Sequence, residues 1–195
     1  NSANAVTIGK QGSNYSDGKI SNVAIHKTVL DAQTISQMAK SRYTPMRDNR
    51  FSVVDFDGSD DKITFTRQVF SGAFTISWWF NGDTETHHQS IFNDSTGANN
   101  NILIKDSNGF VTIRINGTYK AIITAVPHNE WCHIVFTRDG SGNIKSYLNG
   151  VAKGTSSTTD EFALDMIGDG CVMSMSSASM YNVEKSAEEV YAIYQ

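Results

Sequence analysis

The chain has 195 residues, 18% of them charged, and a formal net charge of −4, so it is long enough for one full core with an appendage. Lysine and arginine do not cluster, which argues against nucleic acid as a partner. The longest apolar runs, such as residues 122–126, are too short to insert into a membrane. Many glycines and few prolines, with abundant serine, threonine and asparagine, are typical of an all-β protein.

The first elements along the chain repeat the last ones. Ile20–His26 aligns with Met175–Tyr181, 155 residues later, and the match continues from residues 31–40 into residues 186–195. Repetition at this length indicates tandem modules. Such arrays usually bind partners or build surfaces, so the repeat favours adhesion over catalysis.

The repeat divides the chain into three parts. We predict that residues 1–40 are the C-terminal strand and helix of a preceding module, residues 41–50 a polar linker containing Pro45, and residues 51–195 one whole module. One strand and one helix bury too little apolar surface to fold alone. We therefore expect the first part to dock on the intact module or on a neighbouring chain. A chain that begins within a module is expected to be a fragment or a processed product.

The third part predicts short strands separated by turns rich in Asn, Asp and Gly. Asn116-Gly117 and Asn149-Gly150 predict tight two-residue hairpins. Strands at this spacing are typical of an antiparallel sandwich or barrel. The predicted strands are residues 51–56, 62–66, 74–80, 90–92, 102–105, 110–115, 119–125, 131–137, 144–148, 151–153 and 172–181.

A short amphipathic helix is predicted at the end of the chain, over residues 186–194. Ser186, followed three residues later by Glu189, predicts a capping box at its start. Val190, Ile193 and Tyr194 would form its buried stripe.

The predicted strands also assign side chains to the core. Successive residues of a strand point to opposite faces, so Trp78 should lie in the core with Phe80, and Trp79 should face outward. Cys132 and Cys171 are expected to be buried free thiols rather than a disulfide, and they lack the spacing of a metal knuckle.

Four runs of the chain are distinctive in combination. They are Phe56-Asp57-Gly58-Ser59-Asp60-Asp61, Phe74-Thr75-Ile76-Ser77-Trp78-Trp79-Phe80, Trp131–Gly140 with Tyr147-Leu148-Asn149-Gly150, and, in the first part, Gly18–His26. Together they resemble the laminin G-like modules of the concanavalin A-like lectin/glucanase superfamily. The resemblance implies an all-β fold, an antiparallel two-sheet jelly-roll sandwich (concanavalin A-like) with a short C-terminal helix. Members bind carbohydrates or proteins, some through calcium, and some branches are glycosidases. Tandem variants are frequent in bacterial surface proteins and tailed-phage virion proteins.

Catalytic residues are not predicted. The resemblance implies that a glycosidase would carry Glu-x-Asp-x-x-Glu, or a close variant, on one strand, and the sequence has no such run. His133 lies on a predicted core strand, where packing and hydrogen bonding account for it better than catalysis.

Calcium is the favoured metal, since hard oxygen ligands are abundant in the turns. The candidate ligands are Asp57, Asp60 and Asp61 in one turn and Asn93 and Asp94 in another. The closing strand of the family often carries an acidic pair where this chain has serines, so a site that needs those positions is disfavoured.

Sugar binding would use aromatic faces together with amide groups on loops. The candidate ligand-binding residues are Trp79, Tyr119, His87, His88, Asn99 and Asn100, the last two in an Asn-rich loop that continues to Asn101.

The sequence therefore favours a non-catalytic carbohydrate- or surface-binding module of a larger repetitive extracellular or virion protein. Its expected partners are a carbohydrate or cell-surface polysaccharide, with neighbouring modules or virion proteins as further partners. The alternative is a structural spacer that makes protein–protein contacts without a glycan ligand. A divergent glycosidase is the least favoured reading because the carboxylate pair is missing.

Overall fold

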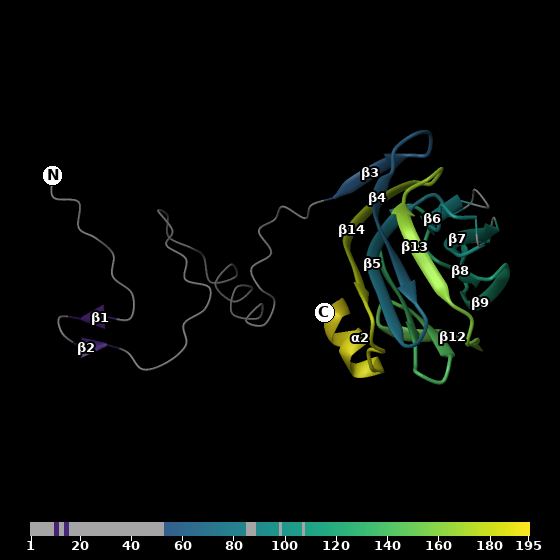
Figure 1. The fold of residues 1–195 in the computed structure, drawn as a ribbon. Coiled ribbons are helices and arrows are strands. Elements are labelled where there is room, and N and C mark those ends of the chain that lie inside the picture. The colour runs from purple at the N-terminus through teal and green to yellow at the C-terminus, as the bar shows by residue number, and fades with distance from the viewer. Residues whose placement is uncertain (1–9, 12–13, 16–52, 85–88, 98, 107) are drawn as a thin grey trace. The chain divides into compact units, whose positions relative to one another are not determined.

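A computed structural model describes residues 10–11, 14–15, 53–84, 89–97, 99–106 and 108–195. The chain divides into two units, Asn1–Asn49 and Arg50–Gln195. In the first unit the described residues form a short antiparallel pair, β1 (Lys10–Gln11) and β2 (Asn14–Tyr15) (Figure 1). The closing strand, helix and linker predicted within residues 16–50 lie outside the described residues, so those assignments stay predictions.

The second unit is built of two antiparallel sheets of six strands each, followed by one helix (Figure 1). The first sheet has the order β12-β11-β10-β5-β14-β3, and the second has the order β4-β13-β6-β7-β8-β9. This arrangement confirms the predicted all-β, two-sheet jelly-roll sandwich with a short C-terminal helix. The elements are β3 (Val54–Asp57), β4 (Ile63–Phe70), β5 (Phe74–Gly82), β6 (Gln89–Asn93), β7 (Asn101–Asp106), β8 (Phe110–Ile115), β9 (Thr118–Ile123), β10 (Cys132–Arg138), β11 (Asn143–Leu148), β12 (Val151–Ser157), β13 (Phe162–Ile167), β14 (Val172–Tyr181) and α2 (Ala187–Tyr194).

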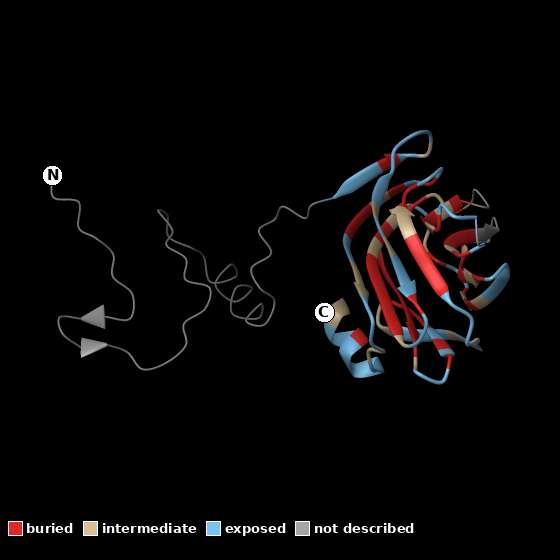
Figure 2. Cartoon of the chain, viewed as in Figure 1, coloured by how far each residue is buried: buried red, intermediate tan, exposed pale blue. Residues whose placement is uncertain are grey.

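The core lies between the two sheets, and buried residues follow their strands (Figure 2). Trp78 of β5 is 0% exposed and meets Phe92 of β6 edge-on, with ring centroids 5.0 Å apart. This contact joins the sheets, because the two strands belong to different sheets. A fully buried side chain of this size stabilises the fold by about 2–3 kcal/mol. The alternation predicted for β5 is confirmed, since Trp78 is in the core and Trp79 is only half-buried on the other face.

One strand of the second unit was not predicted. β13 has the sequence Phe-Ala-Leu-Asp-Met-Ile, whose burial does not alternate and which contains only one β-branched residue. It lies between β4 and β6 and pairs with both. Its place in the sheet, rather than its own composition, makes it a strand. The predicted strand at residue 131 begins one residue later, and Trp131 is 43% exposed.

The C-terminal helix covers the outer face of the first sheet. Its capping box is confirmed, since Ser186 Oγ accepts from Glu189 N at 3.2 Å and Glu189 Oε2 accepts from Ser186 N at 2.9 Å. Val190 is buried against Val135 and Tyr147 of that sheet. Within the described part of the chain, no helix is long and apolar enough to cross a membrane.

Both cysteines are buried and free, as predicted. Cys132 begins β10, and Cys171 directly precedes β14. Burial raises the pKa of each thiol to about 12, so both stay protonated at neutral pH.

Candidate functional site

A row of side chains crosses the outer face of the second sheet. Its members are directly opposite one another in the strand register, and all but the last sit beside a residue of the core. Since the neighbours Phe92, Ile102 and Ile113 point into the core, the row points away from it. We call it the outer row, and it consists of Met166 on β13, Asn93 on β6, Asn101 on β7, Arg114 on β8 and Tyr119 on β9.

Two loops at one end of this sheet, residues 99–100 and the turn at residues 116–117, are joined by hydrogen bonds. Asn116 and Gly117 form the predicted hairpin turn between β8 and β9, with φ of 48° and 79°, the positive values that a type I′ turn requires. The amide of Asn116 donates to Asn100 Oδ1 at 3.0 Å, and the amide of Gly117 donates to the carbonyl of Asn99 at 3.2 Å. The predicted residues Asn99 and Asn100 therefore fix the hairpin that presents Arg114.

A polar pocket of about 360 Å³ lies where the outer row meets these loops. That volume is within the range of small-molecule sites. It is called the loop pocket, and its lining residues are Asn93, Asp94, Ser95, Gly97, Asn99, Asn101, Arg114, Met166 and Asp169. The structure thus brings together candidates that the sequence placed in separate groups, Asn93 and Asp94 as metal ligands and Asn99 as a sugar ligand.

Both carboxylate oxygens of Asp94 accept hydrogen bonds from other residues of the protein. Its Oδ1 accepts from Arg67 Nε at 3.0 Å and its Oδ2 from Arg67 Nη2 at 2.8 Å. The hydroxyl of Thr96 also donates to Oδ1, at 2.8 Å. The Arg67 guanidinium, helped by Thr96, holds the pKa of the Asp94 carboxyl well below its usual range. Because both oxygens are engaged, Asp94 is poorly placed to ligate a cation and instead braces the loop pocket.

Two buried polar atoms of the loop pocket have no hydrogen-bond partner among the described residues. They are Asn101 Oδ1 and Arg114 Nε, which belong to opposite residues of β7 and β8. The other end of the Asn101 amide, Nδ2, donates to Ser90 Oγ at 3.4 Å. A buried unpaired polar group costs about 1–3 kcal/mol, and native proteins rarely leave one without a partner.

The ion pair beneath the pocket predicts a pH dependence of stability. The pKa of Asp94 is lower in the folded chain than in the unfolded one, so ionised Asp94 stabilises the fold above about pH 4, and this contribution is lost as pH falls further. Arg67→Met should therefore lower stability most at neutral pH, with the deficit narrowing toward pH 2. Urea unfolding at stepped pH measures this, with the exposed Lys153→Met as control. A loss of stability in Arg67→Met that stays constant across this pH range would contradict a stabilising ion pair between Arg67 and Asp94.

The remaining predicted residues lie elsewhere. Trp79 is on the outer face of the first sheet, packed against His133 (ring centroids 5.2 Å apart) and Tyr194 of α2 (5.8 Å). His87 and His88 fall outside the described residues. Tyr119 is 37% exposed at the end of the outer row, with the Arg114 guanidinium 5.8 Å from its ring centroid.

The predicted acidic turn brings its carboxylates together. One oxygen each of Asp57, Asp60 and Asp61 lie within 4.8 Å of one another, and all three residues are exposed. The turn holds itself in shape, since the amide of Asp57 donates to Asp61 Oδ2 at 3.1 Å and that of Ser59 to Asp57 Oδ1 at 2.8 Å. Oxygen ligands of this kind suit calcium.

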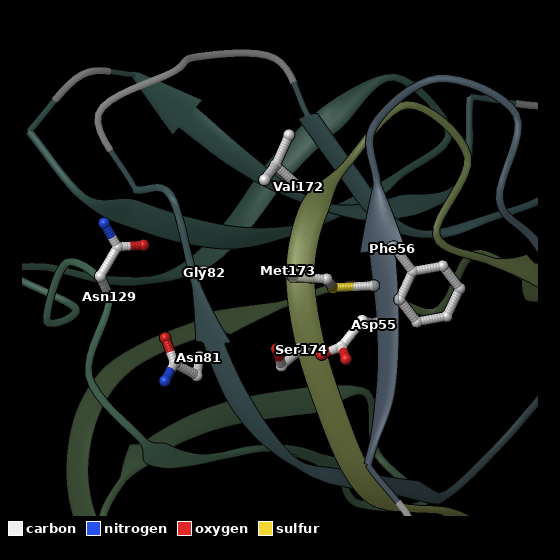
Figure 3. Close-up of a pocket in the computed structure, with 8 residues that line it drawn as sticks. All are labelled: Asp55, Phe56, Asn81, Gly82, Asn129, Val172, Met173 and Ser174. Atoms are coloured by element: carbon white, nitrogen blue, oxygen red, sulfur yellow. Dashed lines mark hydrogen bonds between the residues drawn. The ribbon is translucent and has the colours of Figure 1, made fainter.

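A second pocket of about 300 Å³ lies at the end of the first sheet, beside its edge strand β3 (Figure 3). We call it the edge pocket. Ser174 of β14 lies there between Asp55 of β3 and Asn81 of β5, directly opposite both in the strand register (Figure 3). The Ser174 hydroxyl donates to the Asp55 carboxylate, and Asn129 Nδ2 lies 2.7 Å from His128 Nε2. Its polar groups are thus largely paired, in contrast to those of the loop pocket.

Sequence reasoning did not select Arg114, Met166 or Asp169. The outward position of Arg114 could be read from the alternation Ile113-Arg114-Ile115, all in β8. The residues that lie next to Arg114 could not be predicted from the sequence, because the register that sets Arg114 beside Asn101 is a property of the assembled sheet.

Solved structures with a similar fold include binding domains of botulinum neurotoxins. The serotype D binding domain is 19% identical with a TM-score of 0.59, and the match covers 73% of this chain and 41% of that one. The serotype G binding domain is 15% identical (TM-score 0.56; 73% and 42% covered). The serotype D ligand binding domain in complex with N-acetylneuraminic acid is 18% identical (TM-score 0.54; 73% and 45% covered). The chain spans less than half the length of these structures, and at such identity the likeness shows the fold alone.

No curated protein sequence matches this chain. A family model does match it, that of the laminin G type within the concanavalin A-like lectin/glucanases superfamily, over residues 57–170. This range runs from the acidic turn after β3 to the turn before β14, and it contains the loop pocket. The chain therefore belongs to the concanavalin A-like lectin/glucanase superfamily, as a module of the laminin G type.

Proposed function

We propose that this chain is a non-catalytic carbohydrate-binding module that holds a sugar in the loop pocket. The observation that carries the proposal is the pair of buried, unpartnered polar atoms there, Asn101 Oδ1 and Arg114 Nε. A sugar hydroxyl can donate to the first and accept from the second, which replaces the bonds that burial removed. Tyr119, next to Arg114 in the outer row, adds an aromatic surface at the pocket's side.

Binding without catalysis is supported by the state of the carboxylates. Glycoside hydrolysis needs one carboxyl group with a raised pKa to act as general acid. In the loop pocket, the pKa of Asp94 is shifted in the opposite direction by Arg67. A module that only binds needs no such acid, and in a larger extracellular or virion protein it would supply attachment to a surface polysaccharide.

Calcium assistance is a further part of the proposal. The turn of Asp57, Asp60 and Asp61 is the supported position, because its three oxygens converge. It is separate from the loop pocket, since none of the three lines that pocket. Calcium bound there would stiffen the turn between β3 and β4 rather than contact the sugar.

A glycan-array screen that includes bacterial surface polysaccharides tests the proposal. We expect the wild type to bind a defined set of glycans, and Asn101→Leu to weaken binding about tenfold, because a lost hydrogen bond with a buried group is worth about 1–3 kcal/mol. Asn81→Leu is the matched control, since it removes an amide from the edge pocket instead.

The screen is run with calcium and again with a chelator. Under the assignment above, chelation lowers the melting temperature but leaves the bound glycan set unchanged. A folded wild type that binds no glycan in either condition would overturn the proposal and favour a structural spacer.

A further inference from the structure

We infer that the loop pocket selects a neutral sugar, held through a pair of neighbouring hydroxyl groups, and rejects acidic sugars. The inference rests on the proposed function and adds the class of ligand. It follows from the charges around the pocket and from the hydrogen-bonding capacity of Asn101 and Arg114.

The charges beside the pocket leave a single guanidinium, that of Arg114, for an anionic ligand. Arg67 is engaged by Asp94 through two parallel hydrogen bonds. Asp165 lies beside the loop, where it accepts hydrogen bonds from the amide and hydroxyl of Ser95. Asp169 lines the pocket itself. Among these described residues, Arg114 is therefore the one remaining guanidinium against the two carboxylates of Asp165 and Asp169, so a sugar carboxylate would add to an excess of negative charge around the pocket.

The two unpartnered atoms require a group that both donates and accepts. Asn101 Oδ1 is an acceptor, whereas Arg114 Nε is a donor. A carboxylate only accepts and would leave Asn101 Oδ1 unpaired. A hydroxyl group does both, and its bond with the guanidinium is charge-assisted. If the amide is turned over, Oδ1 takes the contact with Ser90 and Nδ2 faces the ligand, and a hydroxyl still satisfies it.

The spacing of the two atoms favours adjacent hydroxyls on one ring. Asn101 and Arg114 are directly opposite on neighbouring strands, which places their Cβ atoms about 5 Å apart. Side chains at that separation can each reach one of two vicinal hydroxyl groups. The outer row then continues to Tyr119, one strand further. A second sugar ring would lie on this side, about 4.8 Å along the row per strand crossed.

Paired glycans that differ only in an acidic cap test the inference. Lactose and sialyllactose, and a neutral polysaccharide with its uronic-acid counterpart, are compared on the full chain by the glycan array and by calorimetry. We expect binding to neutral members, at least tenfold weaker binding to their acidic partners, and less than about a twofold change in affinity between 0.05 and 0.5 M salt, because a neutral ligand gains nothing from screened charges.

Two variants assign the selectivity to the pocket. Arg114→Met should weaken neutral-glycan binding about tenfold or more, as expected for a lost charge-assisted bond. Asn101→Asp keeps the acceptor oxygen and should bind neutral glycans within about threefold of the wild type, whereas Asn101→Leu should not. Melting temperatures confirm that each variant is folded.

The outcomes separate this inference from the function on which it rests. Preferred binding of acidic glycans that Asn101→Leu or Arg114→Met abolishes would overturn the neutral-sugar inference and leave carbohydrate binding intact. Binding that neither variant alters would show that the sugar lies elsewhere, and absence of all glycan binding would overturn the proposed function itself.

Discussion

Replacing Arg138 with methionine lowers the free energy of unfolding by about 3–5 kcal/mol, because it removes three hydrogen bonds from a charged donor, each worth about 1.5–3 kcal/mol, and the burial of methionine offsets part of that loss. Arg138 is 1% exposed. Its guanidinium donates to the carbonyl oxygens of Gly72 at 2.7 Å, Asp160 at 2.6 Å and Phe70 at 2.7 Å. It also lies 4.8 Å from the ring centroid of Phe74. Methionine fills much of the volume but removes the donor from three carbonyl oxygens, of which that of Phe70 is buried.

These carbonyls explain why the effect should be global. Phe70 ends β4 and Gly72 lies in the turn to β5, while Asp160 lies just before β13. Arg138, on β10 of the first sheet, therefore ties together segments of the second sheet at one end of the sandwich. Burial lowers the pKa of Arg138 from its ordinary value, yet arginine stays charged at any working pH.

Urea unfolding at pH 7 measures this effect, with the midpoint and slope fitted together. Lys62→Met is the matched control, because it makes a similar substitution at an exposed position, where changes stay within about 0.5 kcal/mol. A loss below about 1 kcal/mol for Arg138→Met would show that water replaces the guanidinium, which contradicts its role as a structural clamp.

Trp79→Ala should destabilise the fold by about 2–3 kcal/mol while leaving glycan affinity unchanged. The indole packs against both His133 and Tyr194, and its removal opens a gap beneath α2. The expected loss is smaller than the 3–5 kcal/mol of a fully buried tryptophan because Trp79 is only half-buried. Binding should survive because Trp79 is on the first sheet and the loop pocket is on the second.

Calorimetric glycan titration and urea unfolding on the same preparation separate the two effects. Trp79→Phe serves as the conservative comparison, since it keeps an aromatic ring against Tyr194 and should recover most of the lost stability. A folded Trp79→Ala protein that no longer binds glycan would place the sugar on the first sheet and contradict the assignment to the loop pocket.

Local sequence signals predicted those features whose physics is local. The Asn116-Gly117 pair specifies its turn because both residues tolerate positive φ. Ser186 and Glu189 specify the helix start, because the capping box lies within one turn. The opposite orientations of Trp78 and Trp79 follow from the period of a strand, which needs no knowledge of the partner strand.

The strand β13 could not be predicted from its local sequence. Its Ala-Leu-Asp-Met centre has neither alternation nor β-branched residues, so its pattern resembles a loop or a helix fragment. Hydrogen bonding from β4 on one side and β6 on the other makes it a strand. Met166 enters the outer row, and Asp169 the loop pocket, only because β13 is placed there.

By itself, the sequence determined the all-β class, the turns, the cap and the two faces of each strong strand, because these depend on residues within a few positions of one another. The tertiary structure alone decided which outward residues meet. It paired Arg67 with Asp94, 27 positions apart, and set Asn101 opposite Arg114. It also covered Trp79 with Tyr194 of α2. Such contacts are set by strand register and sheet order. Register and order in turn depend on burial of the whole core rather than on any one segment.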